Sequence, residues 1–126
     1  MKKFIASLSV LVLLAGAVTA HVMWAQSFGK SLSAVAKEVE DAARRDDWQK
    51  ARENLDELSE LWEKNKLWAA ATVRTNIIDE IDIGIEQSKA YAEIKQKPDF
   101  MGEFIMLRKL LEYIPRQEGL SAEELL

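Results

Sequence analysis

An uninterrupted run without ionised side chains, from Phe4 to Trp24, constrains this 126-residue chain more than any other feature of its sequence. Lys2 and Lys3 precede the run, and the next charged side chain is Lys30. A helix of that length rises roughly 32 Å at about 1.5 Å per residue, close to the hydrocarbon core of a bilayer at about 30 Å. We therefore predict that residues 4–24 contact membrane lipid as a single span.

Two interpretations of this segment differ in its fate after export. An uncleaved signal anchor would keep residues 1–26 in the cell membrane, with the N-terminus in the cytoplasm because the lysine pair stays inside. A cleaved signal peptide would end near Ala20, after the small residues of Val18-Thr19-Ala20, and the remainder would be secreted. The anchor is favoured because the apolar run continues past Ala20. In both cases residues 27–126 form an extracytoplasmic domain.

Composition removes several kinds of chemistry from that domain. The chain has no cysteine, and its one histidine, His21, lies inside the apolar run, where it suits the headgroup region. Thiol nucleophiles, multi-histidine metal sites and Ser-His-Asp triads are therefore excluded. Without the two N-terminal lysines, the chain has 15 basic and 21 acidic side chains. This acidic balance argues against nucleic acid and anionic lipid as partners. We predict no cofactor, no metal and no small-molecule substrate.

Apolar residues beyond Lys30 recur three and four positions apart, and no alternating strand pattern occurs. Four such stretches predict an all-α fold, in which the N-terminal helix is followed by an antiparallel bundle of about four helices. The first stretch can continue straight out of the membrane helix, with Gly29 as its one weak point. The predicted core anchors are Trp48, Leu55, Leu58, Trp62, Ile81, Leu107 and Leu111.

Helix boundaries are predicted from capping residues and prolines. Asp46 is expected to cap the second helix, with Gln49 three residues later completing a capping box. A turn is expected within residues 65–76, because one helix through that region would outgrow a small domain. Asp99 is expected to cap the last helix, and Pro115 is expected to end it.

Two of these helix starts resemble each other at an offset of 52 residues, since Asp47-Trp48 is matched by Asp99-Phe100. The match predicts that the bundle is built from two helical hairpins. Asp47-Trp48-x-x-Ala51 also resembles the first helix of a tetratricopeptide repeat, which would indicate a peptide-binding adapter. The period of about 34 residues typical of such repeats is absent, so the adapter is kept as an alternative.

Taken together, three features resemble the bacterial domain-of-unknown-function family 4363. These are the Asp47-Trp48-x-x-Ala51 helix, the acidic stretch Asp79–Asp82, and the leucine-rich helix ending at Ile114-Pro115. Members of that family often carry a histidine before the acidic stretch, where this chain has Thr75-Asn76. The resemblance covers nearly the whole chain, and it implies a small membrane-attached helical protein without a known reaction.

Paired carboxylates are the remaining candidates for chemistry. Glu57 with Glu60, and Asp79 with Asp82 and Glu86, have the spacing of helical enzymes that hold magnesium between two acidic motifs. Such a site needs carboxylates that project into the bundle. The predicted register instead places these side chains away from the core, toward solvent. A carboxylate-based metal-dependent enzyme is therefore the less favoured alternative.

Trp68 differs from the core tryptophans because it lies off the apolar stripe, near the expected turn. Two interpretations stay open: an exposed contact for a partner, or a ring packed under the turn. The function that fits these observations is that of a non-enzymatic, membrane-anchored extracytoplasmic helical domain. We expect it to dock on an integral membrane protein, with Trp68 as the candidate contact.

Overall fold

The computed structural model describes residues 1–71 and 73–125, with side chains as far as Ile114. Every regular element among these residues is a helix, which confirms the all-α prediction. The four helices are α1 (Lys2–Arg44), α2 (Trp48–Ala70), α3 (Thr75–Glu93) and α4 (Lys97–Leu125).

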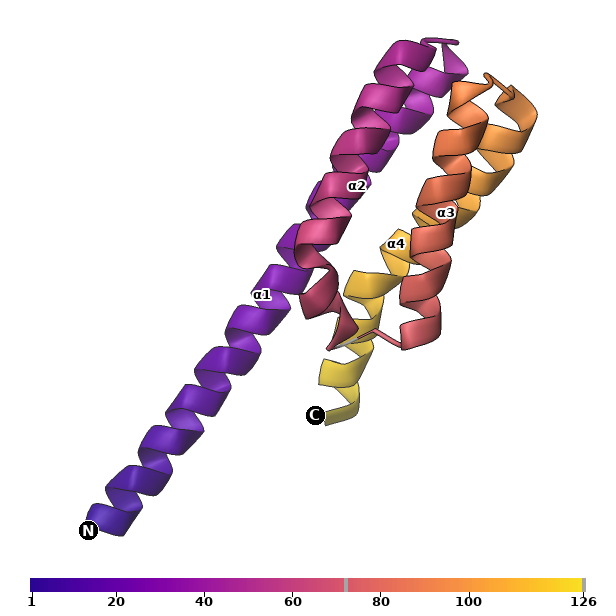
Figure 1. The fold of residues 1–126 in the computed structure, drawn as a ribbon. Coiled ribbons are helices and arrows are strands. Elements are labelled where there is room, and N and C mark those ends of the chain that lie inside the picture. Colours follow the sequence, from indigo (N-terminus) through magenta and orange to yellow (C-terminus); the bar gives the residue numbers. More distant parts are fainter. Residues whose placement is uncertain (72, 126) are drawn as a thin grey trace.

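The helices form an antiparallel bundle of two hairpins, α1–α2 and α3–α4 (Figure 1). α1 packs against α2 and α4, and α3 packs against the same two neighbours. The N-terminal half of α1 projects alone from one end of the bundle, beside the end of α2 and the start of α3. We call this the inner end, and we call the end that carries the α1–α2 and α3–α4 turns the outer end.

α1 is a single helix that joins the apolar run to the bundle without a break. Residues 1–20 are exposed, and packing against the other helices begins at His21 and Ala25. Gly29, the expected weak point, is buried inside the helix. A glycine costs a helix only about 1 kcal/mol relative to alanine, and burial of the nearby Phe28 and Leu32 outweighs that cost. Among the described residues, α1 alone is long and apolar enough to cross a membrane, a test that a signal sequence also passes.

The turn between α1 and α2 corrects the predicted cap by one residue. Asp47, not Asp46, is the N-cap of α2, and its Oδ1 accepts a hydrogen bond from the backbone N–H of Lys50 at 3.2 Å. Asp46 adopts a left-handed conformation with φ 59°, which aspartate tolerates better than most residues. One aspartate therefore ends α1 and the next begins α2.

The turn between α2 and α3 falls inside the predicted window, between Ala70 and Thr75. Arg74 occupies the N-cap position of α3 and makes no side-chain capping bond, so Thr75 and Asn76 lie within the helix. The start of α3 is therefore held by the packing of its apolar face rather than by a cap.

α4 is longer than predicted at both ends. It begins at Lys97, so that Asp99 lies in its first turn, where the carboxylate favours the positive end of the helix dipole. It also continues past Pro115 to Leu125. A proline inside a helix removes one hydrogen bond and favours a kink, but it need not end the helix where the flanking turns remain hydrogen-bonded.

The core runs along the axis between the four helices. All seven predicted core anchors lie in it, the most exposed being Trp48 at 8%. Phe100 and Phe104 from α4 join them, with stacked rings 5.5 Å apart. The Trp48 ring meets Phe100 edge-on at 5.5 Å, so the two residues related by the offset of 52 touch at the outer end.

Candidate functional site

The paired carboxylates do not converge. Glu57 and Glu60 are exposed on α2, while Asp79 and Glu86 are exposed on α3. Among the described residues, no group of three or more acidic or histidine side chains is placed to hold a metal ion. The exposed positions agree with the register predicted from the sequence.

Asp82, the remaining one of these paired carboxylates, was predicted to face solvent but is half-buried and tied to α2. Its Oδ1 accepts a hydrogen bond from the Trp62 indole Nε1 at 2.7 Å, and its Oδ2 pairs with Lys66 Nζ at 2.7 Å. The hydrogen bond to Asp82 raises the pKa of the Lys66 ammonium above its ordinary value of 10.5. Both oxygens of Asp82 are therefore engaged in holding α2 against α3.

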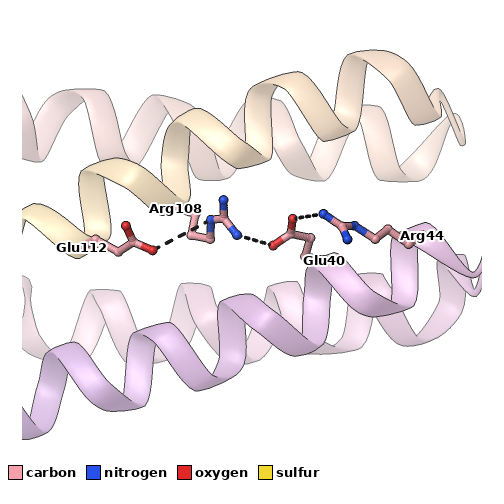
Figure 2. A network of polar contacts seen from close by, with 4 residues as sticks. All are labelled: Glu40, Arg44, Arg108 and Glu112. Atoms are coloured by element: carbon pink, nitrogen blue, oxygen red, sulfur yellow. Dashed lines mark hydrogen bonds and ion pairs between the residues drawn. The ribbon is translucent and has the colours of Figure 1, made fainter.

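Glu40 is a charged residue that sequence reasoning missed. It is 4% exposed, and Figure 2 shows it between two arginines. Its Oε1 pairs with Arg44 one turn further along α1, and its Oε2 pairs with Arg108 of α4, both at 2.8 Å. Arg108 Nε lies 4.0 Å from Glu112, which extends the chain of charges.

The Glu40 network fixes the position of α1 against α4. A buried carboxylate is costly unless its lone pairs are matched, and here two guanidinium groups match them. A carboxylate paired in this way cannot serve as a metal ligand or general base without breaking those bonds. The available sequence signal was the placement of Glu40 next to Val39 on the apolar stripe, four residues before Arg44.

An aromatic ladder occupies the inner end of the bundle. We define it as His21, Trp24 and Phe28 of α1 with Trp62 and Trp68 of α2. The Trp24 ring stacks on Phe28 at 5.2 Å, and Phe28 lies 6.3 Å from Trp62 in the core. On the other side, Trp68 lies 6.2 Å from Trp24 and 6.5 Å from His21.

The ladder passes from the core to the surface in a few steps. Trp62 is fully buried, whereas Trp68 is 60% exposed and the adjacent Leu67 is 84% exposed. Trp24 is half-buried and donates its indole Nε1 proton to Asn65 Oδ1 at 3.0 Å. Of the two interpretations of Trp68, the exposed ring is therefore the one found. A notch of about 370 Å³ lies beside it, lined by Ala17, Ala20, His21, Trp24 and Trp68.

A second apolar surface lies between α3 and α4, where the sequence predicted none. Ile83 is 55% exposed and Met106 is 65% exposed, although both are large apolar side chains. They border two adjoining hollows of about 420 and 240 Å³. We call this surface the α3–α4 groove, lined by Ile77, Glu80, Ile83, Met106, Leu110 and Tyr113. The available signal was that Ile83 and Met106 fall outside the core stripes of their helices.

The helix face that resembles a tetratricopeptide repeat is covered in this fold. Trp48, Ala51 and Leu55 are buried in the core of the bundle. In repeat proteins, stacked helix pairs leave a continuous concave surface open. Here α1 and α3 pack on either side of α2, so this face of α2 is closed to an added peptide.

These features define a class: a small helical bundle continuous with one N-terminal helix that is apolar enough to span a membrane or to act as a signal sequence. The chain belongs to the family described as Domain of unknown function (DUF4363), whose model matches residues 22–125. The match begins where α1 starts to pack on the bundle. No curated protein and no solved structure matches the chain.

Proposed function

We propose that this protein is a non-enzymatic helical domain, anchored in the cell membrane and facing outward, that docks on an integral membrane protein. The observation that carries the proposal is the continuity of α1. Its N-terminal turns expose a long apolar surface that no other helix covers. In water such a surface would be a large exposed apolar patch. Lipid suits it because the side chains are apolar and the backbone groups within the helix are hydrogen-bonded to one another.

The two fates of the N-terminal segment have different consequences. Retention keeps the bundle at a fixed height above the bilayer, because the same helix spans the membrane and forms one side of the core. Cleavage near Ala20 would leave the aromatic ladder complete and release the bundle. Lys2 and Lys3 favour a cytoplasmic N-terminus in the anchored form, because basic residues flanking a span tend to stay inside.

Orientation can be tested by labelling, because the chain contains no cysteine. Ile94→Cys introduces one thiol at the outer end, where Ile94 is 61% exposed. We expect a membrane-impermeant thiol reagent to label it in whole cells, and intact mass measurement to find residues 1–20 retained. Labelling only after lysis would contradict export, and a mature protein beginning after Ala20 would contradict the anchor.

The α3–α4 groove supports a protein neighbour as the docking partner. Its lining side chains all lie on α3 and α4, the two helices that do not carry the apolar N-terminal run. Glu80 and Lys109 at its margins offer polar contacts around the apolar centre, the arrangement typical of protein interfaces. A bundle tethered close to the bilayer reaches proteins of the same membrane first.

Absence of catalysis is part of the proposal. It is supported by the separate, exposed positions of Glu57, Glu60, Asp79 and Glu86, and by the paired oxygens of Asp82. Tight magnesium binding by the purified chain, lost in the Asp79→Asn variant, would contradict it and favour the metal-dependent enzyme instead.

Docking can be tested with a photoreactive amino acid at Met106 in intact membranes, and the same amino acid at Ile94 as the matched exposed control. We expect one adduct with an integral membrane protein at position 106 and none at 94. The adduct should be lost in the Ile83→Asp variant, whose thermal stability should be unchanged because Ile83 lies outside the core. Equal adducts at both positions, or no effect of Ile83→Asp, would contradict docking through the groove.

A further inference from the structure

We propose that the C-terminal turn of α2 enters the outer lipid interface beside α1, with Leu67 and Trp68 as the inserted side chains, so that the bundle is seated on the bilayer. The inference rests on the anchoring part of the proposed function and is independent of the docking partner.

The first observation behind this assignment is the level of Trp68 along the predicted membrane span. The Trp68 ring lies 6.5 Å from His21 and 6.2 Å from Trp24, which occupy the last turn of the predicted membrane span, the run of residues 4–24. If the run fills the hydrocarbon core, its last turn lies at the headgroup level. Trp68 is then at the same level, although it is 44 residues further along the chain than Trp24.

The second observation is the solvent exposure of Leu67 and Trp68. Leu67 and Trp68 are consecutive, large and mostly exposed, and Trp68 shares a notch with Ala17 and Ala20 on the uncovered part of α1. In water this pair would extend the exposed apolar surface of α1. At the interface the indole has a suitable environment, because its ring is apolar and its N–H is polar.

The nearby charges indicate which kind of lipid surface fits. Glu63 and Lys64, on the preceding turn of α2, are both exposed and carry opposite charges. Lys66 is already paired with Asp82 at 2.7 Å. We call the C-terminal turn of α2 with Leu67 and Trp68 the seat. Among the described residues of the last two turns of α2, exposed acidic and basic side chains are mixed and do not form the basic cluster that recognises anionic lipid. The seat therefore fits a zwitterionic phospholipid interface.

Lipid is favoured over a protein neighbour for this patch because the patch is continuous with the lipid-facing surface. The notch beside Trp68 is lined on its other side by Ala17 and Ala20, which belong to the uncharged run itself. An occupant of the notch therefore touches the membrane span and Trp68 together. Lipid surrounds every span, whereas a protein neighbour would have to be present at this side.

The seat would fix the rotation of the bundle about α1. One spanning helix alone allows the bundle to turn around the helix axis. A second contact, at the end of α2, removes that freedom and sets the direction in which the α3–α4 groove points.

The test uses the full chain reconstituted in phosphatidylcholine vesicles, with one cysteine carrying an environment-sensitive fluorophore. Leu67→Cys reports on the seat, Ile94→Cys is the matched exposed position at the outer end, and Leu14→Cys lies inside the apolar run. We expect brominated lipid to quench the label at positions 67 and 14 and to leave the label at 94 bright. A water-soluble quencher should act most strongly at 94.

The outcomes separate this inference from the anchor. Quenching by lipid at 14 but not at 67 would overturn the seat alone. An aqueous label at 14 would overturn the anchor, and the seat with it. A label at 67 that is shielded in native membranes but aqueous in pure lipid vesicles would assign the patch to a protein neighbour and overturn the lipid seat.

A second measurement avoids any bias from the label. Intrinsic tryptophan fluorescence of the unlabelled chain should be quenched by brominated lipid, and Trp68→Phe should remove a larger share of that quenching than Trp48→Phe. Trp48 is the appropriate control because it lies at the outer end, buried against Phe100. Equal losses in the two variants would contradict insertion of Trp68.

Discussion

The two ends of the bundle are held together by different kinds of side chains. At the outer end, polar groups join the turns: Lys97 Nζ donates to the Arg44 carbonyl at 2.9 Å and pairs with Asp46 at 3.3 Å. Ile94 is the large apolar side chain that is exposed there. At the inner end, an aromatic ladder runs from the core to an exposed tryptophan and leucine. The turns of the outer end are thus joined by polar groups that suit contact with water. The inner end exposes a large apolar pair that suits a less polar environment.

The largest effect that tests this contrast is expected within the ladder itself. Trp62→Ala should lower the free energy of unfolding by about 3–5 kcal/mol, because it empties a fully buried site and removes the hydrogen bond to Asp82. Trp68→Ala should cost far less, because its ring is mostly exposed. Denaturant unfolding of the full chain in detergent micelles would measure both changes.

A polar control on the same helix sharpens the comparison. Glu60→Ala, on the exposed face of α2, should stay within about 0.5 kcal/mol of the parent. If Trp62→Ala and Glu60→Ala lowered the free energy of unfolding by similarly small amounts, Trp62 would not be part of the core.

The buried charge network is expected to give the next largest effect. Glu40→Ala leaves Arg108 without its 2.8 Å partner and should cost about 2 kcal/mol, below the range for a fully buried pair because Arg108 is partly exposed. Glu38→Ala, an exposed glutamate on the same helix, is the matched control and should be near neutral. Equal unfolding midpoints for the two variants would show that the network does not help to hold α4 against α1.

The smallest effect concerns the ion pair of Lys66 with Asp82. The pKa of Lys66 is raised in the folded state above its ordinary value of 10.5. The ion pair therefore stabilises the fold fully at pH values below the ordinary pKa, and this contribution is lost as the pH rises through the pKa of the folded state. Thermal midpoints should therefore fall as pH rises above 10.5. Lys66→Met should flatten that part of the pH profile, and an unchanged profile would show that the pair adds nothing. Partial exposure keeps the effect small.

The helices and the core could be predicted from sequence because their signals are local. A spacing of three and four residues places Trp48, Leu55, Leu58 and Trp62 on one face wherever the helix lies. The cap was wrong by one residue because Asp46 and Asp47 are both good capping residues, and local sequence does not decide which of them ends α1.

The buried charge network and the exposed apolar surfaces depend on residues far apart in the sequence. Glu40 is stabilised by Arg108, 68 residues away, so its burial has no complete local signal. Trp68 lies against His21 and Trp24 of another helix, contacts that the sequence around Trp68 does not reveal. The α3–α4 groove likewise exists only once two helices lie side by side, and neither helix alone shows that Met106 borders a hollow.

In the anchored form proposed above, the unbroken path of α1 would also make this helix a lever. From Trp24 to Arg44 the helix rises roughly 30 Å, so a change of about 20° in the tilt of the span would move the outer turn by roughly 10 Å. Membrane spans tilt when bilayer thickness changes, because a long apolar stretch must stay within the hydrocarbon. Thinning of the membrane around this protein would thus be converted into lateral displacement of the outer end.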